Sequence, residues 1–417
     1  MEQTGKGTVY NDKDTVITNQ NQDKASSNTV TIDAGKDKVE VTLKDVNIKA
    51  DSGSALTSNG DVTLTLKGDN HLTGGSGDTY GGDGITSSGS LTISGGTVTA
   101  TGGNSTDSVG SGGSGISSFN RVAISGSTVT ANGGDSSSNS GGYGISSLDV
   151  AISSGTVTAN GGDSKDGSGG NGIYSSSGVA ISGGAVTANG GDSKDGSGGN
   201  GIYSSSSVAI SGGTVTATGG DSTGSDGSGG NGIYSRNGSI DLSGSLELTA
   251  KAGSPNGKAL SQNGSELVLD TIKDKLGPGA KVTATDADGK VIDQVSTPRP
   301  VEPEESSSSS DGGSAAPSAP VSPLPGLTVT DKDGQRISYT STQSGNTLTV
   351  CVGRFTASFR ISLAALRQLR AEGIETIAFQ TILCSTTLSV DELLAMGSED
   401  AEAVLTHRFT DSSLTVG

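Results

Sequence analysis

The chain has 417 residues, of which 69 are glycine and none is tryptophan, and its formal net charge at pH 7 is -18. The negative charge argues against nucleic-acid binding, which depends on lysine and arginine to neutralise phosphates. A coiled coil would need far more Glu, Lys, Leu and Ala, and collagen would need glycine at every third position. No apolar run approaches the length of a membrane span, so we expect no membrane insertion. Either a disordered Gly/Ser chain or a repeat fold with a thin core remains.

A repeated unit decides between these two classes. A Gly-Ile pair recurs every 28 to 31 residues, beginning at Gly84, Gly115, Gly144, Gly172, Gly201 and Gly232. Weaker copies stand at Ala55-Leu56 and Ala259-Leu260. Within a unit, apolar and polar residues alternate with a period of two, which indicates short strands. We therefore predict an all-β parallel solenoid of about eight or more coils over residues 28–297, and residues 1–27 as an N-terminal cap or loose segment.

The units contain insertions of a uniform kind. Residues 161–170 read GGDSKDGSGG, the same letters return at 190–199, and a longer version spans 219–230. These segments hold no apolar residue, so we expect them to protrude as loops on one flank of the solenoid. Residues 265–297 leave the repeat, and we expect them to cover its C-terminal end, because a bare sheet edge would be adhesive.

The C-terminal part changes in composition. Seven of the nine prolines fall at 298–325, and this segment with its serine run predicts an extended linker over residues 298–326. Residues 327–417 predict a small α+β domain, with one helix from an N-cap at Ser362 to a stop at Gly373. A second helix is indicated by Ser389 and Glu392, which have capping-box spacing. Cys351 and Cys384 lie in predicted strands of this domain, where a disulfide and two unpaired thiols are both open.

Catalytic residues are scarce in this chain. The two histidines, His71 and His407, lie in different predicted domains, so a Ser-His-Asp relay or a multi-histidine metal site is not expected. Between residues 84 and 250 the only basic side chains are those of two arginines and two lysines, and the acids recur evenly. We therefore predict no catalytic residue and a protein that is not an enzyme. A pectin-type lyase is the enzymatic alternative.

Repeated acids and amides form the first candidate site. Aspartates recur at matching places in the loops, and stacked coils would bring their oxygens together as hard ligands of the kind that Ca²⁺ prefers. The alternative is that aspartate simply suits glycine-rich turns. The candidate calcium ligands are Asp163, Asp166, Asp192, Asp195, Asp221 and Asp226.

Tyrosines form the second candidate site. Tyr174, Tyr203 and Tyr234 each follow a Gly-Ile pair, so they should point outward and stack on adjacent coils. Beside them, Asn171, Asn200 and Asn231 precede the same pairs. An aromatic strip next to amide and carboxylate groups suits sugar rings. The alternative is a tyrosine ladder and an asparagine ladder that only support the solenoid.

Threonine rows are the third pattern. Pairs such as Thr97 with Thr99 and Thr128 with Thr130 recur from unit to unit, and Ala185 breaks the row. Outward Thr-x-Thr rows on a flat solenoid face are typical of ice-binding proteins. Threonine is also simply a favourable residue for an exposed strand.

Residues 28–295 resemble a family of bacterial carbohydrate-binding domains. The resemblance rests on TLKDVNIKADSGSALTSNGDVTLTLKGDNHLTGG, which begins at Thr42, followed by DGITSSGSLTISGGTVTATGG. It implies a right-handed parallel β-helix of polysaccharide-lyase-like shape, binding to plant-type polysaccharides such as cellulose or pectin, and calcium. The long Gly/Ser/Lys loops and uniform coils depart from that family.

Together these features predict a non-catalytic, monomeric protein, secreted or on a bacterial surface, that binds a plant cell-wall or host glycan along the solenoid. A structural stalk or adhesin that binds proteins is the alternative.

Overall fold

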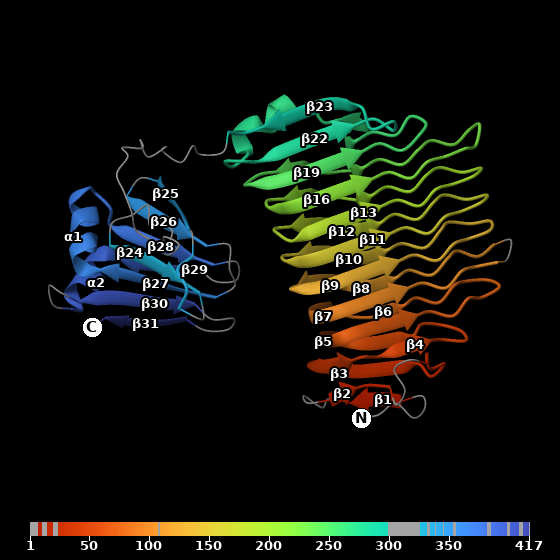
Figure 1. Cartoon of the computed structure of the whole chain (residues 1–417), viewed down its shortest axis with the longest axis horizontal. Coiled ribbons are helices and arrows are strands. Elements are labelled where there is room, and N and C mark those ends of the chain that lie inside the picture. Colours follow the sequence, from red (N-terminus) through yellow and green to blue (C-terminus); the bar gives the residue numbers. More distant parts are fainter. Residues whose placement is uncertain are drawn as a thin grey trace, which may run out of the picture. The chain divides into compact units, whose positions relative to one another are not determined.

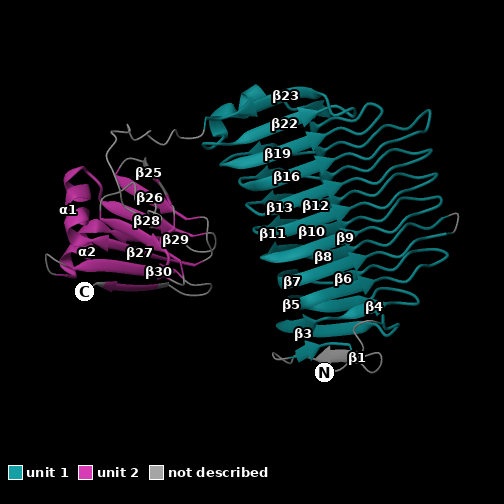
Figure 2. Cartoon of the chain, in the orientation of Figure 1, with its two compact units in different colours: residues 1–304 teal, residues 305–417 magenta. Residues whose placement is uncertain are grey.

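The computed structural model describes residues 7–10, 15–19, 24–106, 109–298, 326–331, 334–337, 339–344, 346–352, 356–381, 385–397, 401–407 and 412–416. The chain forms two compact units, residues 1–304 and 305–417, which Figure 2 shows in different colours. The predicted linker at 298–326 falls almost wholly outside the described residues. Among the helices of the described part of the chain, none has the length and hydrophobicity that a membrane crossing requires.

The first unit is a parallel β-solenoid of about 11 turns, which confirms the predicted fold class. Its strands are β1 (Gly7–Tyr10), β2 (Thr15–Ile17), β3 (Val30–Lys44), β4 (Asn47–Lys49), β5 (Leu56–Thr73), β6 (Ile85–Ser87), β7 (Leu91–Thr101), β8 (Ile116–Ser125), β9 (Ser127–Asn132), β10 (Ile145–Ile152), β11 (Gly155–Asn160), β12 (Ile173–Ile181), β13 (Ala185–Asn189), β14 (Ile202–Ser204), β15 (Val208–Ile210), β16 (Gly213–Thr218), β17 (Ile233–Ser235), β18 (Ile240–Leu242), β19 (Leu246–Lys251), β20 (Leu260–Gln262), β21 (Ser265–Glu266), β22 (Lys281–Thr285) and β23 (Val291–Ser296).

Each coil has three sides, which are clearest where β14, β15 and β16 follow one another. We call the outward surfaces of these strands, with their equivalents in other coils, the first-strand, second-strand and third-strand faces. Every side pairs in parallel with the same side of the next coil, as in Ile202 with Ile233 and Val215 with Leu248. Side chains that alternate inward along these strands are buried, and they form one continuous core. Because that core is a narrow column, a chain with few apolar residues can fill it.

The solenoid begins before residue 28 and closes at its other end. The described strands β1 and β2 already pair in parallel with β3, so part of segment 1–27 belongs to the coils. At the C-terminal end, β23 turns back antiparallel to β22. The 3₁₀ helix η1 (Leu269–Lys275) lies beside this hairpin and buries Leu269 and Ile272. The solenoid end is therefore covered, as the sequence predicted for residues 265–297.

The glycine-rich loops project from one flank of the solenoid, as Figure 1 shows. Each loop has an outgoing and a returning arm, and the Gly170 N–H donates to the Gly162 carbonyl across these arms at 2.8 Å. The next coil continues the chain of bonds, since the Gly191 N–H donates to Gly170 at 2.8 Å. A Cβ added at Gly170 would lie 1.9 Å from the Gly142 carbonyl oxygen. Glycine is thus required by close backbone approach, and the loops are stacked layers joined by hydrogen bonds.

The second unit is the predicted small α+β domain. It has two four-stranded sheets, one of β24, β27, β30 and β31 and the other of β25, β26, β28 and β29. As predicted, Ser362 caps the first helix through the Ala365 N–H, and Ser389 caps the second through the Glu392 N–H. Of the two alternatives left open for the cysteines, the unpaired thiol holds for Cys351, which is free and donates to the Gln380 side-chain oxygen at 3.2 Å; Cys384 is outside the described residues. The elements are β24 (Leu327–Thr330), β25 (Thr340–Ser344), β26 (Thr347–Cys351), β27 (Ala357–Ser362), α1 (Leu363–Ala371), β28 (Thr376–Gln380), β29 (Ser385–Ser389), α2 (Val390–Ala395), β30 (Glu402–His407) and β31 (Ser412–Val416).

Candidate functional site

The predicted tyrosines form a stack on the first-strand face. Tyr174, Tyr203 and Tyr234 are partners in the parallel register of β12, β14 and β17. The rings of Tyr174 and Tyr203 are nearly parallel, with centroids 5.2 Å apart, whereas Tyr203 and Tyr234 meet edge to face at 5.4 Å. All three side chains are partly buried. The tyrosines stack because each follows a Gly-Ile pair, and these pairs occupy the same place in successive coils.

A fourth ring, Tyr143, extends this stack by one coil. Its centroid lies 4.8 Å from that of Tyr174, with the two ring planes within 10°. The register partner of Tyr174 in that coil is Ser146, a small residue that leaves room for the Tyr143 ring. Burial raises the pKa of the Tyr143 hydroxyl, with smaller contributions from Tyr174 and Tyr203. Sequence reasoning missed Tyr143 because it precedes its Gly-Ile pair, at the place of Asn171.

The geometry of the stack limits what it can bind. A sugar ring would need an open aromatic face, and both faces of Tyr174 are covered by Tyr143 and Tyr203. Arg236 lies next to the stack, and its hydrogen bond with the Tyr203 hydroxyl raises the pKa of the guanidinium. The stack therefore offers edges and hydroxyl groups to a ligand. The contacts between the rings are those expected of the alternative stated for these tyrosines, a ladder that supports the solenoid.

The predicted asparagines form a ladder of their own. The Asn171 side-chain oxygen accepts from the Asn200 backbone N–H at 2.8 Å and from its side-chain amide at 2.9 Å. Asn200 repeats both bonds with Asn231, at 2.9 and 2.8 Å. The Asn231 oxygen then accepts from the Lys258 N–H at 3.0 Å. Each amide oxygen thus already has partners in the next coil, which is the structural alternative stated for these residues.

The loop aspartates also form a ladder of hydrogen bonds from coil to coil. One oxygen of Asp163 accepts from the Asp192 N–H at 2.8 Å, Asp192 accepts from Asp221 at 2.7 Å, and Asp221 accepts from Ser254 at 2.7 Å. These three exposed carboxylates follow one another in successive coils. Across the residues that the structure describes, no group of three or more His, Cys, Asp or Glu is arranged to hold a metal ion. Calcium binding here stays a prediction.

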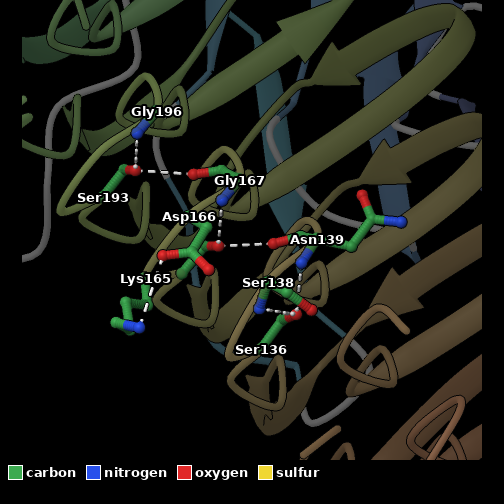
Figure 3. Close-up of polar contacts among 9 residues, drawn as sticks. Ser136, Ser138, Asn139, Lys165, Asp166, Gly167, Ser193 and Gly196 are labelled. Carbon is green, nitrogen blue, oxygen red and sulfur yellow. Dashed lines mark hydrogen bonds and ion pairs between the residues drawn. The ribbon is translucent and has the colours of Figure 1, made fainter. Parts of the chain in front are cut away.

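The other predicted aspartates lie at the loop tips. Asp166 forms an exposed ion pair with Lys165 at 3.6 Å, which Figure 3 shows. Asp195 and Asp226 are exposed in later loops. These tip residues are thus separate from the ladder that contains Asp163, Asp192 and Asp221.

A buried serine series supports the tips and was not foreseen. Ser193 donates to the Gly167 carbonyl at 2.6 Å and accepts from the Gly196 N–H at 2.8 Å (Figure 3). Ser222 donates in turn to the Gly196 carbonyl at 2.6 Å. Each hydroxyl therefore closes its own loop tip and ties it to the preceding one. The repeated Asp-Ser pair in the loops was the available sequence signal.

A groove on the second-strand face has no counterpart among the predicted sites. Its volume is about 310 Å³, and it crosses β3, β5, β7 and β8. That size is near the lower end of ligand pockets. The lining residues are Lys38, Asp61, Val62, Thr63, Ser90, Thr92, Arg121 and Ala123.

The groove presents charged groups above a floor of small side chains. Lys38 and Asp61 are register partners, and the Asp61 carboxylate accepts from the Ser90 N–H at 2.8 Å. This bond is the main reason that the pKa of Asp61 is lowered, and Lys38 lowers it further. Arg121 is exposed, and within the described part of the chain it forms no ion pair. Two cations, beside a carboxylate that is bound to Ser90, are therefore available to a polar ligand.

Sequence reasoning missed this groove because it counted basic residues only within the regular repeats. Lys38 and Asp61 lie in earlier coils, and only the parallel register brings them near Arg121. Phe119, two residues before Arg121, is 77% exposed and adds an open aromatic surface on the same strand. The irregular residues of the solenoid, and not the repeated ones, thus make the better candidate site.

The comparison with protein families agrees with the fold. A family described as beta helix repeat matches residues 91–116, 122–147, 150–172 and 208–232. No curated protein and no solved structure matches the chain. The matched segments and the coil geometry together define the first unit as a parallel β-helix.

Proposed function

We propose that this protein is a non-catalytic polysaccharide-binding protein, with the glycan lying along the second-strand face of the β-helix. The groove that contains Lys38, Asp61 and Arg121 carries the proposal. Charged side chains hydrogen-bond to sugar hydroxyls, and a floor of Thr63, Thr92 and Ala123 leaves space for flat rings. A small number of placed polar and charged groups fixes the orientation of a ligand in such sites.

The direction of the groove favours a polymer over a free sugar. Lys38, Asp61, Ser90 and Arg121 belong to four successive coils, which rise by about 4.8 Å each. An extended glycan along the axis of the solenoid would therefore meet a new set of side chains at every coil. We expect binding to strengthen with chain length, since several weak contacts then act together.

The test compares two double variants of the full chain on a panel of soluble plant cell-wall and host polysaccharides. Lys38→Ala with Arg121→Ala removes both cations of the groove. Lys165→Ala with Lys194→Ala removes the same charge from the exposed loop tips. Retardation in gels that contain each polymer gives the affinity. We expect the groove variant to lose at least tenfold in affinity, because one hydrogen bond to a charged group contributes about 1.5–3 kcal/mol and a tenfold change corresponds to about 1.4 kcal/mol.

Three outcomes would contradict this proposal. If no polymer retards the wild-type chain, polysaccharide binding is wrong. If both double variants weaken binding equally, net charge and not the groove is responsible. If unsaturated or shortened products accumulate in the incubations, the chain is a lyase or hydrolase and not only a binding protein.

A structural stalk is the second candidate function, and a specific observation favours it. The tyrosine stack, the asparagine ladder and the serine series all use their polar or aromatic groups within the solenoid. A chain built only as a spacer would have such self-contained faces. Absence of binding across the panel, with the fold intact, would favour this function.

We also infer that the protein acts outside the cell or on a bacterial surface. The inference is supported by the Gly/Ser/Thr-rich repeats, by the Pro/Ser-rich segment at 298–326 and by the net charge of -18. Detection of the full chain in the surface or medium fraction of the producing cell tests it. Recovery only from the cytosol would contradict it.

A further inference from the structure

The third-strand face carries a regular array of threonines that the proposed function does not use. Over five successive coils, each strand turns three side chains outward, and eleven of these fifteen are threonine. The middle column is threonine in every coil. The three columns are Thr97, Thr128, Thr156, Ala185 and Thr214; Thr99, Thr130, Thr158, Thr187 and Thr216; and Thr101, Asn132, Asn160, Asn189 and Thr218. We call these fifteen residues the threonine face.

This face is uncharged and keeps an unbroken register. None of its side chains ionises, although the chain carries a net charge of -18. The pairings of β7, β9, β11, β13 and β16 with one another run without a register shift, whereas β10 pairs with both β8 and β12 across a shift between Ser147 and Asp149. Threonine is branched at Cβ and has few rotamers on a strand. Its hydroxyl and methyl groups are therefore held in a repeating order.

The spacing of these hydroxyl and methyl groups follows from strand geometry. Neighbouring coils are about 4.8 Å apart, and outward residues along one strand are about 6.6 Å apart. Oxygen atoms on the faces of crystalline ice recur at separations of this size in two directions. Hydroxyl groups can join such a lattice by hydrogen bonds, while the methyl groups between them order the water around them.

We propose that the threonine face binds ice. The face lacks the charged groups of the proposed glycan groove and any aromatic ring, because none of its fifteen residues is aromatic or ionisable. The ligand it fits is a flat, uncharged, hydroxyl-like lattice. Asn132, Asn160 and Asn189 bond to one another along the third column, so their side chains stay fixed as well.

The test measures ice recrystallisation and thermal hysteresis with the full chain. Thr158→Lys with Thr187→Lys places two bulky charges in the middle of the threonine face. Ala180→Lys with Ala209→Lys makes the same charge change on the second-strand face, where both alanines are exposed. We expect the wild type and the alanine-site variant to inhibit recrystallisation and the threonine-site variant to lose this activity. Circular dichroism and thermal melting confirm that each variant folds.

A second variant covers the case in which the lysines disturb the coils. Thr158→Val with Thr187→Val keeps the shape of the side chains and removes only the hydroxyls, and we expect partial loss of activity. An inactive wild type would overturn the proposal, as would equal activity in both lysine variants. Loss of retention on an insoluble polysaccharide by the threonine-site variant, with no effect of the wild type on ice, would also overturn it and assign the face to glycan binding.

Discussion

The polar side chains of the β-helix have different neighbours in its regular coils, at about residues 130–260, and in its early coils, at about residues 30–125. Between about residues 130 and 260, the asparagine amides, loop aspartates and buried serines bond to groups of the neighbouring coil, as Asn200 does with Asn171 and Asn231. In the early coils, Lys38, Asp61 and Arg121 have neighbours of different kinds, and a groove lies between them. Repeated polar side chains therefore find hydrogen-bond partners within the chain. Charged side chains that are not repeated, such as Lys38 and Arg121, stay available to a ligand.

This difference changes where function should be sought in a repeat fold. Repeated residues are the most visible feature of the sequence, yet the amides, loop aspartates and buried serines among them already have partners in neighbouring coils. Buried polar groups must find such partners, since an unpaired one costs about 1–3 kcal/mol. A ligand competes poorly with partners that are already in place. Residues that interrupt the repeat are therefore the better candidates for glycan binding.

Substitution of a loop glycine in the regular coils should lower the stability most. In Gly170→Ala, the new Cβ would lie 1.9 Å from the Gly142 carbonyl oxygen, so the loop arms must separate. We expect the free energy of unfolding in urea to fall by about 3 kcal/mol, the upper range for overpacking. The control is Gly178→Ala, whose Cβ would meet no atom closer than 3.7 Å. Equal loss in both variants would show that close stacking of the arms is not required.

Removing one member of the asparagine ladder should have a moderate effect. Asn200→Ala removes the acceptor of the Asn231 N–H and the donor to Asn171. We expect a loss of about 1–3 kcal/mol in the free energy of unfolding, because polar groups remain without partners. Ser176→Ala, at an exposed position two residues after Tyr174, is the control and should be near neutral. An unchanged stability of Asn200→Ala would contradict the self-satisfied ladder.

A smaller effect is expected in the tyrosine stack. Tyr203→Leu removes the ring between Tyr174 and Tyr234, and aromatic pairs contribute about 0.5–1.5 kcal/mol beyond burial. We expect a loss near 1 kcal/mol in unfolding free energy and no change in polysaccharide affinity. Loss of affinity with stability retained would restore the tyrosines as the glycan site and reverse the contrast between the two regions.

Removal or addition of calcium should change the stability least. One oxygen of Asp163, Asp192 and Asp221 already accepts an N–H from the next coil, and the carboxylates stand one per coil. We therefore expect EDTA and added CaCl₂ to leave the melting temperature unchanged. A rise with CaCl₂ that is lost in Asp192→Asn would show that the ladder binds the cation that the sequence suggested.

The accuracy of the sequence-based predictions depended on whether a feature was local or periodic. Ser362 was recognisable as a helix cap because capping involves residues three positions apart. Tyr174 and Tyr203 were recognisable as neighbours because the coil length is nearly constant. Tyr143 was not, because its ring enters a column that its sequence position does not indicate. The space that Ser146 leaves is visible only once the coils are stacked.

A period of about 29 residues, visible in the sequence, assigns the glycine-rich composition to a parallel β-helix with a separate α+β domain, because that period sets the length of a coil. It also determines which residues form columns. Which columns already have partners, and which side chains stay open to a ligand, depends on how the coils stack. Lys38 and Arg121 are 83 residues apart, and their common groove depends on the register between coils of unequal length. Coil length, and not a local motif, controls that register.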